Sequence, residues 1–199
     1  APSLKKRVIK GSIWTLGGYF TSQIIRLGSN LIVSRLLFPE AFGLMALVYT
    51  FIAGLEMLSD LGIGPNVIQS KRGEEPIFLD TAWTLAICRG VVLWLCACII
   101  AWPVAEFYKE PILRYMLPVA GLTSLFNGFV STKWMTANRN LKLGRLTVMD
   151  ISTQVAGVAI MVVAAWYAHV MKLPQEIAVW ALLIGALVSG LVKVVLSHA

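Results

Sequence analysis

The sequence predicts an all-α protein, a polytopic bundle of about six transmembrane helices. The first observation behind this prediction is composition: of 199 residues, 58% are hydrophobic and 14% are charged, against roughly 45–50% apolar and about 25% charged in soluble domains. The second is a mean hydropathy of +0.77. A soluble domain of this length buries only about 70% of its unfolded surface, so this chain would leave large apolar patches in water. The bilayer must therefore supply part of the solvent.

The third observation is a series of apolar blocks, each long enough to cross a hydrocarbon core of about 30 Å at about 1.5 Å per helical residue. The predicted spans are 12–37, 43–69, 80–106, 112–136, 146–170 and 176–197. Each is expected to be a helix, because backbone N–H and C=O groups in a bilayer need partners within their own segment. Pro39, Pro111 and Pro174 stand where connections between blocks are needed.

The distribution of Lys and Arg predicts the topology. With a cytoplasmic N-terminus, the inner segments would hold ten of these residues and the outer segments four, namely Arg35, Lys109, Arg114 and Lys172. Cytoplasmic loops carry the excess of positive charge in membrane proteins. We therefore expect a multi-pass protein with both ends of this sequence on the cytoplasmic side.

The same composition argues against several classes of function. The net charge of +7 comes from cations between apolar blocks, without the basic and aromatic strip that stacks bases, so we expect no nucleic-acid partner. Cys88, Cys96 and Cys98 lie in one apolar block and are too few for a disulfide framework. Because no His, Cys or acidic residues have metal-ligand or catalytic spacing, we expect no metal, no cofactor and no enzymatic activity.

Polar side chains form a stripe along the first block. At about 100° per residue they fall within one sector of the helix. They are Thr15, Tyr19, Ser22, Arg26, Ser29 and Asn30. A charge at the bilayer centre costs about 2.5–3.5 kcal/mol on insertion scales, so such groups normally face protein or water. Because a helix–helix contact needs fewer polar groups than this, the stripe predicts a wetted wall.

Ionisable residues continue into the second and third blocks. Glu56 and Asp60 lie one turn apart on one face. Counted from the cytoplasmic ends, Arg26 and Glu56 lie at one depth, and Arg89 and Asp60 at another. We therefore predict two ion pairs, Arg26 with Glu56 and Arg89 with Asp60, which either hold the helices together or line a transport site. Asp150 is a further candidate, equally consistent with an acid stabilised near a helix N-terminus.

Two stretches resemble the beginning of bacterial polysaccharide flippases of the Wzx type, in the multidrug/oligosaccharidyl-lipid/polysaccharide exporter superfamily. They are residues 35–45, RLLFPEAFGLM, and residues 58–69, LSDLGIGPNVIQ. Residues 4–14 and 135–142 are also similar to that family. The resemblance extends over nearly the whole chain and is most specific across 35–69.

The resemblance implies a transporter of the bacterial inner membrane. Such a protein moves a polyprenyl-diphosphate-linked oligosaccharide to the periplasmic leaflet by alternating access, and its expected partners are the bilayer, that lipid-linked oligosaccharide and the polysaccharide polymerase machinery. Family members have two six-helix lobes around a cavity, and this sequence matches the N-terminal lobe. The end of the sequence at Ala199 favours a fragment without the C-terminal lobe.

A diphosphate in a low-dielectric cavity needs cations, and Arg offers it bidentate donors. The candidate substrate-binding residues are Arg26 first and Arg89 second, with Ser22, Asn30 and Tyr19 from the polar stripe. The candidates for ion pairing or coupling are Glu56, Asp60 and Asp150.

Two alternatives remain open. A cation-coupled multidrug exporter of the same superfamily would use Glu56 and Asp60 to bind an ion or a proton, and dye efflux would identify it. A non-transporting membrane scaffold would use the charged groups for packing alone. In that case, cysteines placed along residues 15–30 would be inaccessible to water.

Overall fold

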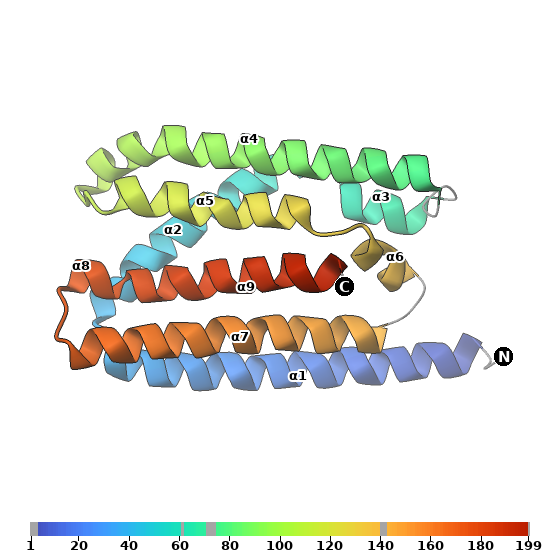
Figure 1. The fold of residues 1–199 in the computed structure, drawn as a ribbon, viewed down its shortest axis with the longest axis horizontal. Helices are drawn as coiled ribbons and strands as arrows, with labels where there is room; N and C mark the ends of the chain where they lie inside the picture. Colours follow the sequence, from blue (N-terminus) through green and yellow to red (C-terminus); the bar gives the residue numbers. More distant parts are fainter. Residues whose placement is uncertain (1–3, 61, 71–74, 140–142, 199) are drawn as a thin grey trace.

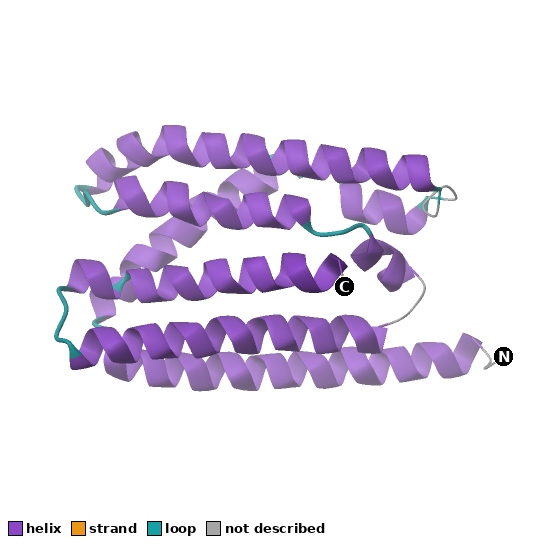
Figure 2. Cartoon of the chain, viewed as in Figure 1, coloured by secondary structure: helices purple, strands orange, loops and turns teal. Residues whose placement is uncertain are grey.

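The computed structural model describes residues 4–60, 62–70, 75–139 and 143–198, and every regular element in these residues is a helix (Figure 2). The helices are α1 (Leu4–Leu36), α2 (Pro39–Leu58), α3 (Ile63–Gln69), α4 (Pro76–Tyr108), α5 (Leu113–Phe129), α6 (Lys133–Arg139), α7 (Leu143–Val170), α8 (Gln175–Ala178) and α9 (Trp180–His198). The all-α prediction is confirmed. Of the residues behind the predicted topology, Lys71, Arg72 and Lys142 lie outside the described residues.

Four helices are long and apolar enough to cross a membrane: α2, α4, α7 and α9. Helices α1 and α5 run alongside α7 and α4 (Figure 1). With 17 residues, α5 lies at the lower limit of the about 17–25 residues of a spanning helix, and it is not among these four. The prediction of a multi-pass membrane bundle is thus confirmed, and six crossings remain a prediction that depends on α1 and α5.

The helices are arranged as two hairpins joined in the middle of the bundle. Helix α4 packs against α5, and α7 packs against α9, while contacts between α5 and α9 join the two hairpins. Helix α1 covers the outer side of α7, and α2 crosses obliquely behind α5 (Figure 1). The start of α1 and the end of α9 lie toward the same end of the bundle, together with the short helices α3 and α6.

The apolar core lies where α2, α4, α5 and α9 meet. Val48 of α2, Ala97 of α4 and Leu183 of α9 are fully buried there, with Met116 and Leu117 of α5. Because lipid chains are as apolar as these side chains, helices in a bilayer associate through close packing rather than through the hydrophobic effect. The core residues therefore depend on how closely the helix backbones approach one another.

Glycines allow the helix backbones to approach closely. A Cβ added at Gly128 of α5 would lie 2.6 Å from the backbone oxygen of Ala86 in α4. One added at Gly185 of α9 would lie 3.0 Å from the backbone oxygen of Gly157 in α7. Each hairpin is therefore held together at a point where only glycine fits between two backbones, as small residues commonly allow in membranes.

The second predicted block, 43–69, is divided into two helices, a break that was not predicted. Helix α2 ends at Leu58, and α3 begins at Ile63. Gly62 has a φ of 62°, a left-handed conformation that favours glycine. Its N–H donates to Oδ1 of Asp60 over 2.9 Å, as in the local turns that Asp forms with its own backbone. The predicted block 112–136 is likewise divided, into α5 and α6.

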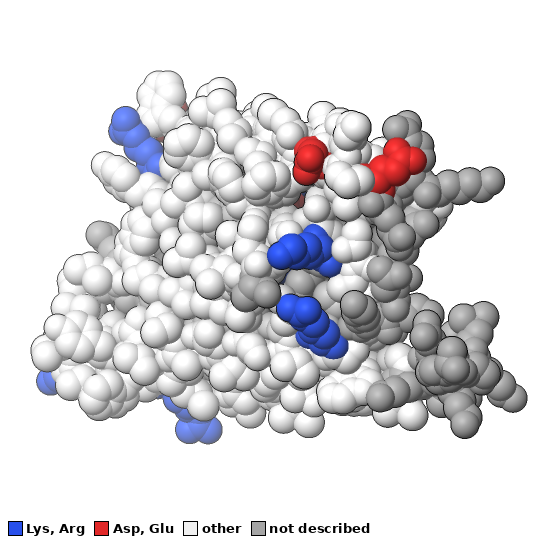
Figure 3. Space-filling model, turned by 45° about the vertical axis from the view of Figure 1, so that its right-hand side comes forward, with Lys and Arg blue, Asp and Glu red and all other residues white. Residues whose placement is uncertain are grey.

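The outer surface suits a lipid environment. Figure 3 shows a broad face on which Lys, Arg, Asp and Glu lie mainly toward the margins, with a few gathered at one side. Large apolar side chains are exposed on several helices, including Ile24 and Leu31 of α1, each 69% exposed, and Ile99 of α4, 73% exposed. Exposed apolar surface of this extent marks contact with lipid or with another protein.

Candidate functional site

A polar cavity lies beside the break between α2 and α3. Its volume is about 360 Å³. Its lining residues are Glu56, Asp60, Ile63, Ala86, Arg89, Gly90, Leu93, Ser124, Asn127, Gly128 and Lys193. We call it the Glu56–Arg89 cavity. It receives side chains from α4, α5 and α9 as well as from the broken segment.

Arg89 of α4 caps the C-terminal end of α2. Its Nε donates to Oγ of Ser59 over 3.1 Å, and one terminal nitrogen donates to the backbone oxygen of Glu56 over 2.9 Å. The last carbonyls of a helix have no partner within the helix, and a cation near them also interacts favourably with the helix dipole. Arg89 therefore makes it possible for α2 to end inside the bundle.

The carboxylate of Glu56 faces α5. Its Oε1 accepts a hydrogen bond from Oγ of Ser124 over 2.8 Å, and Ser124 itself is buried. Gly128, one turn further along α5, lets α4 and α5 approach beside this contact. The acid is thus held by an uncharged donor instead of a cation.

The charges of the cavity balance formally. Arg89 and Lys193 contribute two cations, and Glu56 and Asp60 two carboxylates. Arg89 lies about 20 Å along α4 from Pro76, at about 1.5 Å per residue. The group therefore lies well within the length of the bundle, where charges normally face protein or water.

Neither predicted ion pair is formed, and all four residues of these pairs lie in the described part of the chain. Arg26 is exposed on α1, and α1 packs against α7, so Arg26 does not meet Glu56. Arg89 and Asp60 line the same cavity, but Arg89 donates to Ser59 and to the backbone of Glu56. Asp60 accepts from the backbone of Gly62 instead. Counting residues from the membrane surface predicts depth, but it does not predict which helices are neighbours.

The polar stripe of α1 lies partly along a second hollow, between α1 and α7. This α1–α7 groove has a volume of about 410 Å³ and is lined by Thr15, Gly18, Tyr19, Ser22, Thr147, Asp150, Ile151 and Gln154. Ser22 donates from Oγ to Oε1 of Gln154 over 2.6 Å, and Nε2 of Gln154 donates to the backbone oxygen of Ser22 over 3.0 Å. Arg26 and Asn30 are exposed and do not line this groove.

The structure thus brings together some of the predicted site residues and separates others. Glu56, Asp60 and Arg89 share one cavity, while Tyr19, Ser22 and Asp150 share the other. Lys193 and Ser124 were not among the predicted site residues. Lys193 lies near the end of the sixth predicted span, 176–197, where a cation is typical of an interfacial anchor. Ser124 and Asn127 lie about one turn apart in the middle of a predicted span, and this spacing is the signal that could have identified them.

The chain is similar to one described protein family and to curated membrane and lipopolysaccharide biosynthesis proteins. The family described as "Polysaccharide biosynthesis protein" matches residues 32–199. An uncharacterized membrane protein in the cps region of Klebsiella pneumoniae is 25% identical over 123 residues, which are 60% of this chain and 24% of that protein. The lipopolysaccharide biosynthesis protein WzxC of Escherichia coli strain K12 is 24% identical over 167 residues, 83% of this chain and 33% of that protein.

This chain therefore spans about a quarter to a third of the length of these curated relatives. No solved structure matches it.

Proposed function

We propose that this chain, which belongs to the polysaccharide biosynthesis protein family, forms the N-terminal lobe of a transporter that flips a polyprenyl-diphosphate-linked oligosaccharide across the bacterial inner membrane by alternating access. Its N-terminus lies in the cytoplasm. The single observation that carries this proposal is the charged Glu56–Arg89 cavity at a helix break. The polysaccharide polymerase machinery is an expected partner of such a transporter.

The helix break supports a transport role. Transporters place substrate and ion sites near the bilayer midplane, where interrupted helices expose backbone groups to a cavity. Here α2 ends at Leu58 beside the cavity, and α3 follows at Ile63. A scaffold has no need to end a helix among charged groups, since an unbroken apolar helix is more stable in a bilayer.

The cations of the cavity suit a diphosphate. Arg89 uses some of its N–H donors on Ser59 and Glu56, and a guanidinium retains further donors for a phosphate oxygen. Lys193 provides a second cation on the same cavity. We therefore assign the diphosphate contact to Arg89 and Lys193.

Glu56 and Asp60 remain the candidates for coupling. While both carboxylates are ionised, they balance the two cations of the cavity. Protonation of either one leaves a net positive charge, which favours entry of an anion. Relays of intramembrane acids couple proton movement to transport in this way.

The groove residues keep a secondary role. Tyr19, Ser22 and Asp150 line the α1–α7 groove and are candidates for contacts with the saccharide. Arg26 and Asn30 remain candidates for substrate contact from the exposed side of α1.

Complementation tests this function with the full-length protein. A strain that lacks its own polysaccharide flippase should regain surface polysaccharide with the wild-type protein and with Arg114→Ala, a change in an exposed cation of α5 that does not line the cavity. Arg89→Ala should lose rescue and accumulate the lipid-linked precursor while its membrane expression stays normal.

Full rescue by Arg89→Ala would refute the assigned role of the cavity. Failure of the wild-type protein to rescue, together with dye efflux from vesicles, would instead identify the cation-coupled multidrug exporter.

A further inference from the structure

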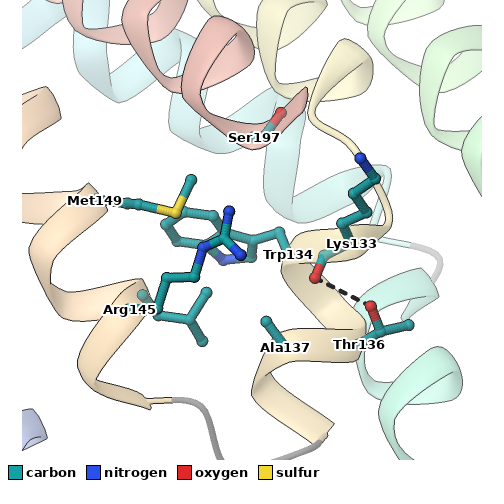
Figure 4. A pocket seen from close by; sticks show the side chains of 8 residues that line it. Lys133, Trp134, Thr136, Ala137, Arg145, Met149 and Ser197 are labelled. Atoms are coloured by element: carbon teal, nitrogen blue, oxygen red, sulfur yellow. Dashed lines mark hydrogen bonds between the residues drawn. The ribbon is translucent and has the colours of Figure 1, made fainter. Parts of the chain in front are cut away.

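A second set of cations lies at the end of the bundle where α1 begins and α9 ends. A pocket of about 220 Å³ opens there between α6, α7 and α9 (Figure 4). Its lining residues are Lys133, Trp134, Thr136, Ala137, Arg145, Leu146, Met149 and Ser197. We call it the basic pocket. It is smaller than the about 300–1,000 Å³ of pockets for drug-sized ligands, so it suits a small polar group.

The pocket is rich in donors. Arg145 of α7 extends toward Trp134 of α6 (Figure 4), and its guanidinium has no hydrogen-bond or ion-pair partner among the described residues. Lys133 uses its ammonium for one long contact, 3.4 Å to the backbone oxygen of His198. Both side chains are exposed, so their remaining N–H donors are not taken up by the part of the chain that the structure describes and can reach a ligand.

The pocket offers few competing acceptors. Among the described residues that line it there is no Asp or Glu. The hydroxyls of Thr136 and Ser197 carry no charge, and they donate to the backbone oxygens of Lys133 over 3.0 Å and of Val194 over 2.7 Å. A ligand therefore meets two cations without a carboxylate to neutralise them.

Trp134 supplies a flat wall and a link to a third cation. Nζ of Lys193 lies 5.3 Å from the centroid of the Trp134 ring, within the range of a cation–π interaction. Because Lys193 also lines the Glu56–Arg89 cavity, its contact with this ring connects the basic pocket to the proposed transport site.

We propose that the basic pocket binds a phosphate group, held by Arg145 and Lys133. Arg pairs bidentately with phosphate oxygens, and Lys adds a point charge. Basic pockets between membrane helices on the cytoplasmic side recognise the phosphates of anionic lipids. Soluble phosphate compounds offer the same chemistry. This site is separate from the Glu56–Arg89 cavity and does not depend on the proposed transport function.

The first arm of the test measures lipid retention. Full-length protein is placed in vesicles of phosphatidylcholine with phosphatidylglycerol, extracted, and examined by native mass spectrometry. Wild-type protein should retain phosphatidylglycerol in preference to phosphatidylcholine. The double variant Lys133→Gln/Arg145→Gln should lose that preference by about tenfold, the effect of losing one strong charged contact. The matched control Lys109→Gln/Arg114→Gln removes two exposed cations at the turn between α4 and α5, at the end of the bundle away from the basic pocket. It should leave the lipid preference unchanged.

The second arm uses inorganic pyrophosphate with protein in phosphatidylcholine alone. Pyrophosphate should alter the tryptophan fluorescence of the wild-type protein, and Trp134→Phe or the double variant should remove that response. A response to pyrophosphate without lipid preference assigns the site to soluble phosphates, and lipid preference assigns it to anionic lipid.

Equal lipid retention together with no fluorescence response in the wild-type protein overturns the proposal, even where the double variant does not fold. Retention or fluorescence responses that survive in a folded double variant overturn it as well. Complementation by the same variants is scored separately, so failure of the pocket and failure of the transport function are distinguishable.

Discussion

The Glu56–Arg89 cavity and the α1–α7 groove are both polar hollows in an apolar bundle, but their polar groups are satisfied differently. In the groove, Ser22 and Gln154 satisfy each other through two hydrogen bonds. In the cavity, Arg89 donates to a backbone oxygen at the end of α2, and Glu56 accepts a hydrogen bond from a serine. Lys193 contacts an aromatic ring. The groove is therefore joined by a contact between two uncharged side chains, with Asp150 as its one acidic lining residue among those described. The cavity contains charges that lack opposite charges as direct partners, which suits the binding of a charged ligand.

The packing beside the cavity should give the largest effect on stability. Gly128→Leu forces a side chain against the backbone of Ala86, which no rotamer change relieves, so we expect a loss of more than about 3 kcal/mol in the free energy of unfolding. The matched change Gly17→Leu, on α1 where a Cβ meets nothing within 4 Å, should cost less than about 0.5 kcal/mol. Reversible unfolding in mixed micelles measures both. Equal losses would show that α4 and α5 do not approach at Gly128.

Removal of the Arg89 side chain, which caps α2, should give the second-largest loss of stability. Arg89→Ala removes the charged donor from the backbone oxygen of Glu56, which then keeps only the hydroxyl of Ser59. We expect a cost of about 1–3 kcal/mol in the free energy of unfolding, together with loss of transport. Arg89→Lys keeps the charge but not the two-point contact with Ser59 and Glu56, so it should recover part of the stability. The same micelle unfolding assay and complementation give the two readouts. A stable, inactive Arg89→Ala protein would separate substrate binding from capping.

The groove should respond more weakly. We expect a coupling energy of about 0.6 kcal/mol between Ser22 and Gln154, the average for hydrogen bonds between membrane helices. A double-mutant cycle of Ser22→Ala and Gln154→Ala measures it. A coupling energy well above about 1.7 kcal/mol would place this pair among the strongest such contacts. It would contradict the expectation that the groove contributes less to stability than the cavity.

The smallest effect on stability is expected at Arg26. It is exposed and has no hydrogen-bond partner for its side chain among the described residues, so Arg26→Ala should change stability by less than about 0.5 kcal/mol. Its transport activity should exceed that of Arg89→Ala. If Arg26→Ala instead abolishes rescue at normal expression, Arg26 would replace Arg89 as the first candidate for substrate contact.

The sequence predicted the helical class and the polar residues, but not their neighbours. Hydrophobic blocks identified α4 and α7 well, since length and composition suffice for such helices. The residues 58–69 carried the family resemblance, and the break at Gly62 falls within them. That break depends on one left-handed residue and on a cap supplied by Arg89 from a distant helix, which periodicity within one block cannot reveal. The order in which helices pack, which separates Arg26 from Glu56, is likewise a tertiary property.

Thiol labelling tests the central claim that the Glu56–Arg89 cavity contains water. In a full-length protein with Cys88, Cys96 and Cys98 replaced, Asn127→Cys lies on the cavity and Ile99→Cys on the exposed apolar face of α4. A water-soluble maleimide should label Asn127→Cys and leave Ile99→Cys unlabelled. Failure to label Asn127→Cys, or equal labelling of both positions, would contradict a hydrated cavity.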